Sequence, residues 1–544
     1  MSDRESWGSR VGLVLAMAGN AVGLGNFLRF PAQAAQNGGG AFLIPYLISF
    51  VLMGVPLLWV EWAIGRHGGQ YGHHSAPGMF DRMGKSPWLK YLGVFGIFTN
   101  LTVAAYYCYI ESWTLAYVWH SIVGTFRTVN PTEFFPRYLG VHERSLFALP
   151  LQAFFWFVLT LGLNVWILSR GLAKGIEIAA KIGMPLLILF GIVLAIRGLL
   201  LRPGDPGVMQ SSLEGLNFVW NPQLHGLTNP TTWLAAAGQI FFTLSVGMGS
   251  IHCYAAYVRR NQDIALNAAS AGWMNEFVEV LLGGSILIPI ATAYLGLQAV
   301  QGATTGGSGF SLGFLSLPTL LNNWGWFAPV AGAMWFGLLF FAGITSSLAM
   351  GQPVMAFFED EYAVKRARAA LLFGAATFSL GFVCVWLYPG GAFDEFDFWT
   401  GTFSLVVFAL GEAFIFAYVF GIDRGWEEIT RGADMKVPGF FRHVIKYVTP
   451  LFILAIFAAS LVKPAGEWGV ALSSLFSGGG WPLAPDSVIG KVLHVGVDYK
   501  WFDAEGHGTP ALVQDLTRVL LSLVFVFCGY LVWKAWRLKA GRNP

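Results

Sequence analysis

A short polar interruption in the first long apolar segment constrains this chain more than any other feature. Residues 20–26 read Asn-Ala-Val-Gly-Leu-Gly-Asn, and they lie inside a largely apolar segment that runs from residue 11 to residue 36. A helix that crosses lipid must satisfy its backbone groups internally, so a polar break at mid-depth persists where protein or a bound polar ligand surrounds it. If this segment crosses a membrane, the interruption predicts a binding site within it.

The composition places the chain in a lipid bilayer. Of its 544 residues, 55% are hydrophobic and 12% are charged, whereas roughly a quarter of the residues in a soluble domain are charged. A helix needs about 18 to 20 apolar residues to cross a bilayer. We therefore predict an all-α membrane protein with twelve transmembrane helices, at residues 11–36, 41–65, 91–124, 146–168, 175–200, 231–257, 271–300, 326–358, 369–388, 398–421, 447–464 and 511–535.

The distribution of lysine and arginine predicts the orientation. Basic loops resist translocation and therefore favour the cytoplasmic side of a membrane. With the N-terminus inside, most Lys and Arg residues fall in inner loops, and the outer stretches 301–323 and 389–397 contain none. We expect a multi-pass protein of the cell inner membrane with both termini in the cytoplasm.

The sequence lacks the motifs that several other classes of protein require. The four cysteines lie inside predicted spans without a Cys-x-x-Cys motif, the ten histidines show no metal-ligand spacing, and no Gly-x-x-x-x-Gly-Lys-Ser/Thr motif is present. The net charge of +3 is accounted for by topology. These observations disfavour an enzyme, ATP binding through a phosphate-binding loop, and a nucleic-acid partner.

A second interruption indicates an internal repeat. Residues 245–249, Ser-Val-Gly-Met-Gly, break the sixth apolar segment as residues 20–26 break the first. An offset of five spans inverts the second unit, so the breaks would face each other at the membrane midplane; the alternative is that these glycines only allow close helix packing. The predicted units are a first repeat at 1–197, an outer loop at 198–230, a second repeat at 231–421, and two further helices at 422–544 with a long outer loop at 465–508.

Neutral oxygen-bearing side chains gather near both breaks. Amide and hydroxyl oxygens, with backbone carbonyls freed by a break, suit a hard monovalent cation such as sodium, whereas a divalent ion usually requires several carboxylates. The free N–H groups of a half-helix favour a carboxylate. For any single Ser or Thr, the alternative is a hydroxyl bonded to its own helix. The candidates are Asn20, Asn26, Gln239, Thr243, Ser245, Asn275, Thr345, Ser346 and Ser347.

Three sequence motifs make a family resemblance specific. Residues 19–31, 239–245 and 342–347 closely resemble the neurotransmitter:sodium symporters, especially their bacterial LeuT-like members, and the similarity runs from residue 4 to about residue 464. The resemblance implies a LeuT-type 5+5 inverted repeat in which helices 1 and 6 are broken. It also implies a sodium-coupled amino-acid symporter that works by alternating access with two sodium ions.

The resemblance implies how the ligands would be held. The substrate carboxylate would complete the shell of the first sodium ion, which couples the two ligands directly. An uncharged pocket containing adaptable methionines would select hydrophobic amino acids, from aliphatic to aromatic. The first sodium site would use Ala21, Asn26, Thr243 and Asn275, and the second Gly19, Val22, Ala342, Thr345 and Ser346. The substrate would contact Asn20, Ala21, Leu24, Gly25, Val103, Tyr107, Phe242, Thr243, Ser245, Met248, Ser346 and Met350.

The resemblance also assigns two gates. Arg29 and Asp397 would close the outer side; the alternative is a permanent salt bridge between helices. Arg4 and Asp360, with Tyr257, would close the cytoplasmic side; the alternative is a solvated surface ion pair of little energetic worth. The uncharged, glycine-rich stretch 306–324 is predicted to be a lid over the outer vestibule.

Glu279 is a carboxylate inside a predicted span and therefore a functional candidate. An acidic residue at this position resembles the chloride-independent type of the family, so we expect no chloride requirement and proton binding at Glu279 on the return step. A non-transporting amino-acid sensor on the same fold is the main alternative to a symporter, and the oligomeric state is left open.

Overall fold

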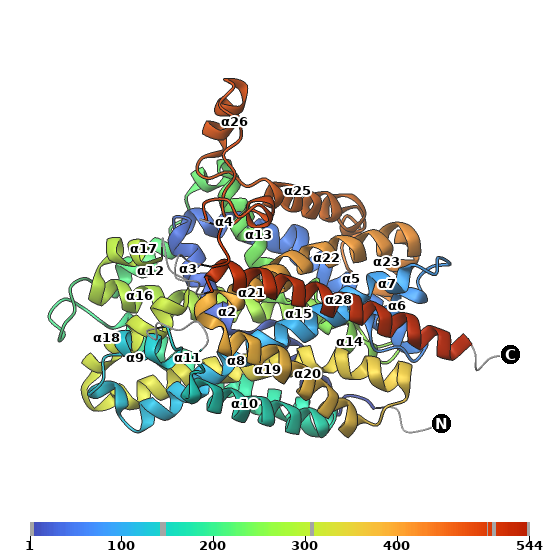
Figure 1. Ribbon diagram of the computed structural model, residues 1–544, viewed down its shortest axis with the longest axis horizontal. Coiled ribbons are helices and arrows are strands. Elements are labelled where there is room, and N and C mark those ends of the chain that lie inside the picture. Colours follow the sequence, from blue (N-terminus) through green and yellow to red (C-terminus); the bar gives the residue numbers. More distant parts are fainter. Residues whose placement is uncertain (1–4, 142–147, 305–308, 498, 503–507, 541–544) are drawn as a thin grey trace.

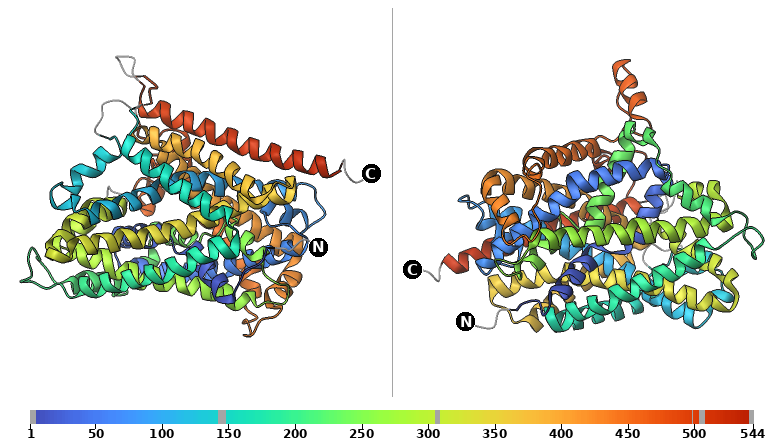
Figure 2. Two further views of the ribbon diagram at one scale, coloured as in Figure 1. Left: turned by 90° about the horizontal axis from the view of Figure 1, so that it is seen from below. Right: turned by 180° about the vertical axis from the view of Figure 1, so that it is seen from behind.

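Long helices lie side by side along the longest axis of the molecule (Figures 1 and 2). The structure is a computed structural model that describes residues 5–141, 148–304, 309–497, 499–502 and 508–540. Apart from isolated β-bridges, the regular elements of these described residues are helices, which confirms the all-α prediction. Helix α1 (Arg10–Ala21) begins at the end of the bundle at which α28 (Pro510–Ala540) ends.

Ten helical segments among the described residues are long and apolar enough to cross a membrane, where the sequence predicts twelve. Each of the ten overlaps one predicted span. The other two predicted spans, 11–36 and 231–257, are divided into helices that are each too short to cross a membrane alone. The ten are Gly40–Gln70, Leu89–Ile122, Leu151–Ser169, Leu172–Leu199, Ile264–Leu295, Ser311–Tyr362, Arg366–Trp386, Ala392–Thr430, Phe441–Leu461 and Pro510–Ala540.

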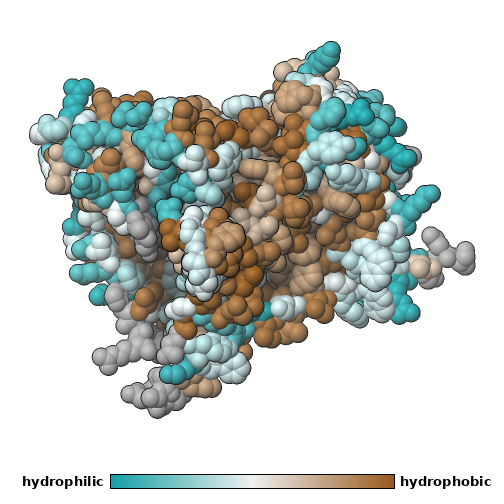
Figure 3. Space-filling view, turned by 90° about the horizontal axis from the view of Figure 1, so that it is seen from above, coloured by the Kyte–Doolittle hydropathy of each residue, from teal (hydrophilic) through white to brown (hydrophobic). Residues whose placement is uncertain are grey.

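The surface has the polarity of a protein that spans a bilayer. Figure 3 shows apolar side chains gathered over the middle of one face and hydrophilic side chains at its two ends. Large apolar residues such as Phe155, Leu189 and Leu523 are exposed. Apolar surface of this extent is stable only against another apolar phase, which for a bundle of long apolar helices is lipid. The chain is therefore a multi-pass membrane protein.

The first divided segment consists of α1, α2 (Leu24–Phe27) and α3 (Arg29–Gln36). Between α1 and α2, Val22 and Gly23 have extended backbone conformations, so the helical hydrogen-bond ladder stops there. The segment lies in the core, because α1 packs against α11 (Glu177–Leu199), α15 (Ile264–Glu276) and α19 (Ala328–Tyr362).

The second divided segment consists of α13 (Pro230–Leu244) and α14 (Ser250–Ala256). Between them, Ser245, Gly247 and Gly249 have φ angles of 54°, 71° and 91°. Left-handed conformations favour glycine because a Cβ atom there is strained. At Gly247 a Cβ atom would also lie 2.3 Å from the carbonyl oxygen of Leu405. Both the backbone conformation and the lack of space therefore require glycine at this position.

The remaining helices surround these two segments. α8 and α19 make the most extensive contact between any two helices, and α5 lies against α14. Between α15 and α16, η5 continues the same long helical segment as a wider π-helical stretch. The elements used below are α5 (Val55–Gln70), α8 (Val94–Ile122), η5 (Phe277–Gly283), α16 (Gly284–Leu295), α20 (Arg366–Trp386), α21 (Ala392–Phe398) and α22 (Ser404–Phe414).

Two stretches predicted as a lid and a loop contain helices. The described part of 306–324 includes η6 (Ser311–Ser316) and α18 (Leu317–Leu321), and Gly309 lies so close to Leu28 that a Cβ atom would overlap the Leu28 carbonyl oxygen. The described part of 465–508 includes α26 (Trp468–Phe476), which projects away from the bundle (Figure 1), and α27 (Val488–Val492). The second stretch contacts α21, because Lys491 pairs with Glu395 at 3.1 Å.

Candidate functional site

The two helix breaks meet in the centre of the bundle. The Ser245 hydroxyl donates to the carbonyl oxygen of Asn20 at 2.9 Å, which joins the second break to the first. Beside this contact is a cavity of about 20 Å³, room for about one water molecule. The cavity is lined by residues of both breaks and of helices packed against them: Ala21, Gly23, Gly25, Asn26, Val103, Tyr106, Tyr107, Phe242, Thr243, Ser245, Met248, Ser346, Met350, Gly401 and Leu405.

Three buried polar side chains form one network beside this cavity. Asn26 Nδ2 donates to Asn275 Oδ1 at 2.8 Å, and Asn275 Nδ2 donates to Thr243 Oγ1 at 3.0 Å. Asn26 Oδ1 also accepts from the Gly23 N–H at 2.8 Å, which holds the side chain against the break. Neutral oxygens converging from α2, α13 and α15 are the ligand chemistry of a monovalent cation. With Ala21 on the cavity wall, the residues predicted for the first sodium site lie together.

A second set of oxygens connects α1 to α19. The Ser346 hydroxyl lies 3.1 Å from the carbonyl oxygen of Gly19, 3.3 Å from that of Val22 and 3.1 Å from that of Ala342. Thr345 Oγ1 lies 3.2 Å from the Ala342 carbonyl oxygen. These carbonyl and hydroxyl oxygens again offer neutral ligands to a hard cation. The five residues predicted for the second sodium site are therefore brought to one place.

The N-terminal end of α2 faces Tyr107. The Leu24 N–H donates to the Tyr107 hydroxyl at 3.0 Å. A Cβ atom at Gly23 would lie 2.7 Å from this hydroxyl, and one at Gly25 would lie 2.6 Å from the Phe242 ring. Backbone N–H groups that approach an aromatic hydroxyl this closely form a suitable place for a carboxylate.

Two of the predicted substrate contacts, Asn20 and Leu24, do not line the central cavity. The Asn20 side chain is buried but makes no hydrogen bond to the described residues, and it does not line the central cavity. Its backbone carbonyl is what reaches the site, through Ser245. The sequence could not show whether the side chain or the backbone carbonyl of Asn20 faces the site, because this depends on the rotation of the helix at the break.

A larger cavity of about 270 Å³ adjoins the central one. Arg29 and Asp397 both line it, as predicted for an outer gate, but they form no ion pair with each other. The Arg29 guanidinium lies over the Phe242 ring, 4.4 Å from its centroid, and Asp397 accepts from the Tyr106 hydroxyl at 2.9 Å. Four residues line both cavities and therefore lie between the two spaces: Gly25, Tyr106, Tyr107 and Phe242.

Asp360 and Tyr257, which the resemblance assigns to a cytoplasmic gate, make hydrogen bonds to neighbouring residues. Asp360 accepts from the backbone N–H of His74 at 2.6 Å, and Tyr257 accepts from Gln352 at 3.0 Å. The ring of His74 stacks on Tyr257 with centroids 4.2 Å apart. Arg4, the predicted partner of Asp360, lies outside the described residues. An ion pair at 2.7 Å between Glu5 and Arg366 lies in the same region.

The carboxylate of Glu279 is surrounded by hydrogen-bond donors. Tyr46 donates to Glu279 Oε1 at 3.0 Å, Gln239 Nε2 donates to the same oxygen at 2.9 Å, and the Thr243 hydroxyl donates to Oε2. Tyr46 also reaches Glu276 at 3.1 Å. Because Thr243 also belongs to the network of Asn26 and Asn275, Glu279 is connected directly to that network.

Sequence reasoning missed several of these residues. Tyr106, Gly401 and Leu405 line the central cavity, and no motif marks them, because their positions depend on how α8, η9 (Trp399–Phe403) and α22 pack. Glu276 did carry a signal, since it is a second carboxylate inside the predicted span 271–300.

A sequence model of the sodium:neurotransmitter symporter family matches residues 4–127 and 125–470 of the chain. A sodium-dependent transporter of Methanocaldococcus jannaschii, itself uncharacterised, is 29% identical over 86% of this chain and 93% of its own. The sodium-dependent nutrient amino acid transporter 1 of Drosophila grimshawi is 25% identical over 95% of this chain and 86% of its own. A crystal structure of MhsT in complex with L-phenylalanine superposes with a TM-score of 0.71 at 30% identity, over 84% of this chain and 99% of that one.

Proposed function

The chain belongs to the sodium:neurotransmitter symporter family, and we propose from this premise that it is a sodium-coupled symporter of hydrophobic amino acids. Its relatives are sodium-dependent transporters, so the protein is a transporter and not an enzyme. We further propose two sodium ions for each substrate, independence of chloride, and twelve membrane crossings arranged as two inverted repeats with helices 1 and 6 broken. Both termini would lie on the cytoplasmic side of the cell inner membrane.

One observation carries the proposal. Ala21, Asn26 and Thr243 belong to the first oxygen set and also line the central cavity. A substrate carboxylate in that cavity would lie against a cation held by those oxygens, so each ligand would form part of the other's site. Coupling of this kind is reciprocal, because each ligand raises the affinity for the other by the same factor.

The driving force is sufficient without ATP. One sodium ion entering across about 100 mV supplies roughly 2.3 kcal/mol, and a tenfold sodium gradient adds about 1.4 kcal/mol. Two ions therefore supply about 7.4 kcal/mol, which sustains an amino-acid gradient of roughly 10⁵-fold.

The cavity lining supports a hydrophobic substrate. No Asp, Glu, Lys or Arg is among the described residues that line the central cavity, and Val103, Met248, Met350 and Leu405 supply apolar surface. Because the cavity has room for about one water molecule, its lining must move apart to admit an amino acid, and flexible methionines can re-pack around side chains of different size. The phenylalanine bound to MhsT agrees with such a substrate for this protein.

Counterflow in proteoliposomes tests the function. Vesicles loaded with unlabelled phenylalanine or leucine should accumulate the labelled amino acid from outside when sodium is present, and not when potassium replaces it. Sodium-dependent binding without flux would instead assign the protein as a sensor. Equal binding in both salts would contradict the cation sites.

We expect Asn275→Ala to abolish the sodium dependence of amino-acid binding. The change removes the amide that links Asn26 to Thr243, and a lost ligand to a charged group costs about 1.5–3 kcal/mol, or roughly a 10- to 100-fold loss of affinity. Scintillation-proximity binding in sodium and in potassium measures the effect. Asn164→Ala is the matched control, because Asn164 is equally buried but bonds to Glu111 and Ser347.

Ser346→Ala should raise the sodium concentration for half-maximal uptake by about 10-fold, since one hydroxyl ligand of the second set is lost. Ser347→Ala is the control, because the neighbouring hydroxyl bonds to Asn164 and lies outside the oxygen set. Uptake measured against sodium concentration at fixed substrate compares the two. The same shift in both variants would argue against Ser346 as a ligand.

A further inference from the structure

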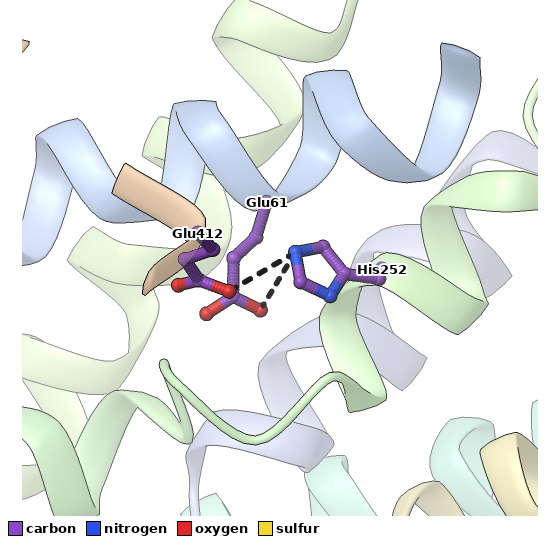
Figure 4. Close-up of side chains that lie close together, drawn as sticks. All are labelled: Glu61, His252 and Glu412. Atoms are coloured by element: carbon purple, nitrogen blue, oxygen red, sulfur yellow. Dashed lines mark ion pairs between the residues drawn. The ribbon is translucent and has the colours of Figure 1, made fainter. Parts of the chain in front are cut away.

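A buried cluster of two carboxylates and one imidazole lies apart from the oxygen sets described above. Glu61 on α5, His252 on α14 and Glu412 on α22 point toward one another (Figure 4). His252 Nε2 lies 3.3 Å from Glu412 Oε2 and 4.0 Å from Glu61 Oε2. All three side chains are 0% exposed. We propose that this cluster is a binding site for one divalent transition-metal cation, with Zn²⁺ as the reference ion.

The charge of the cluster calls for a cation. If both carboxyl groups are ionised beside a neutral imidazole, the cluster carries two negative charges, and buried charge that neither a proton nor a cation compensates is strongly unfavourable. No Lys or Arg of the described residues forms an ion pair with Glu61 or Glu412, and their titratable partner is the imidazole of His252. One divalent cation brings the cluster to zero net charge and leaves both carboxylates and the imidazole free to act as ligands.

The polar atoms of the cluster are free of other partners. Both nitrogens of His252, both carboxylate oxygens of Glu412 and Oε2 of Glu61 make no hydrogen bond to the described residues. Glu61 Oε1 accepts from the Gly247 N–H at 2.6 Å, which fixes this carboxylate and leaves Oε2 directed at the imidazole. Phe80 and Phe408 flank the imidazole, each with its ring centroid 5.9 Å away. Unpaired buried polar atoms that converge in an apolar surrounding point to a ligand between them.

The geometry suits a small divalent ion. The ligand atoms lie within 4.8 Å of one another, so a central point is about 2.8 Å or less from each of them. Zinc bonds to nitrogen and oxygen are about 2.0–2.2 Å long, and small side-chain movements close the difference. One imidazole with two carboxylates is a donor set for zinc, manganese or iron(II), whereas calcium prefers oxygen ligands alone.

The ion would connect the second half of a broken segment to the surrounding bundle. α14 carries His252, whereas α5 and α22 carry the two carboxylates. Glu61 also holds Gly247 inside the break itself. A metal here would therefore anchor α14 to both neighbours and support the conformation of the break from its cytoplasmic half.

Metal content of the purified full-length protein tests the proposal. Protein in detergent is equilibrated with Zn²⁺, passed over a desalting column, and assayed by mass spectrometry. We expect about one retained equivalent in the wild type and a loss of affinity of about 100-fold or more in His252→Leu and Glu412→Gln. His73→Leu is the control, because His73 pairs with the single carboxylate of Glu361 at 3.0 Å and should not change the retained equivalent.

X-ray absorption at the zinc edge of the wild type provides a test that does not depend on variants folding. The expected first shell contains nitrogen and oxygen with one imidazole and without sulfur. Zinc should also raise the unfolding temperature of the wild type, because an ion that binds the folded state stabilises it. The proposal is overturned if the wild type retains no zinc, if His252→Leu retains as much as the wild type, or if the first shell contains sulfur or several imidazoles.

Discussion

We expect Gly25→Ala to lower amino-acid uptake by about 100-fold or more. A Cβ atom at this position would lie 2.6 Å from the Phe242 ring, and Phe242 lies between the central cavity and the larger one. The Arg29 guanidinium also lies over this ring, 4.4 Å from its centroid, which limits the space into which the ring can move. Overpacking of this kind costs about 1–3 kcal/mol, and a 100-fold loss corresponds to about 2.7 kcal/mol.

A loss of uptake in Gly25→Ala would be caused by the geometry of the site and not by helix propensity. Alanine is favoured over glycine inside a helix by up to about 1 kcal/mol, so propensity alone would make Gly25→Ala harmless or stabilising. Gly238→Ala on α13 is the matched control, because a Cβ atom there meets nothing within 4 Å. Initial rates of sodium-driven uptake, corrected for the amount of reconstituted protein, measure both. Wild-type uptake in Gly25→Ala would show that Phe242 does not hold this position during transport.

The number and places of the long helices could be read largely from the sequence. The prediction 91–124 corresponds to Leu89–Ile122, and 369–388 corresponds to Arg366–Trp386. Lipid imposes this regularity, because about 20 apolar residues are needed for each crossing and the chain has few other ways to bury them. The spans that differ from continuous helices, 11–36 and 231–257, are those in which the sequence itself places glycines and amides.

The convergence of oxygen-bearing side chains near each break could also be anticipated, because the residues that carry these oxygens lie in or near the sequence motifs. Asn26, Thr243 and Asn275 do converge, and Ser346 does reach the carbonyl oxygens near the first break. The gates could not be anticipated in the same way. Whether Arg29 pairs with Asp397 or lies over Phe242 depends on small displacements between helices, and no local pattern records them.

The cluster of Glu61, His252 and Glu412 shows the same limit. Each residue is a visible exception inside a predicted apolar span, so each carries a signal alone. Their convergence depends on how α5, α14 and α22 pack, and these helices are far apart in the sequence. A single sequence thus shows which polar groups are unfavourably placed in an apolar span, but it does not show which of these groups lie together.

Glu279→Ser should make uptake dependent on chloride. The carboxylate now accepts hydrogen bonds from Tyr46, Gln239 and Thr243, all within the buried core. Without it, Gln239 loses the acceptor of its Nε2, Tyr46 keeps only Glu276 within reach and Thr243 keeps only Asn275, and an unsatisfied buried group costs about 1–3 kcal/mol. A small anion held by the same donors restores both the hydrogen bonds and the negative charge beside the first oxygen set, so chloride would replace the carboxylate.

Uptake with gluconate or chloride as the external and internal anion measures this dependence. We expect the wild type to transport equally in both, and Glu279→Ser to lose about 10-fold or more of its rate in gluconate and to recover it as chloride is added. Glu276→Gln is the control, because it alters the neighbouring carboxylate, which also accepts from Tyr46, and leaves Glu279 in place. A wild type that stops in gluconate, or a Glu279→Ser variant that ignores the anion, would show that the donors around Glu279 do not form an anion site.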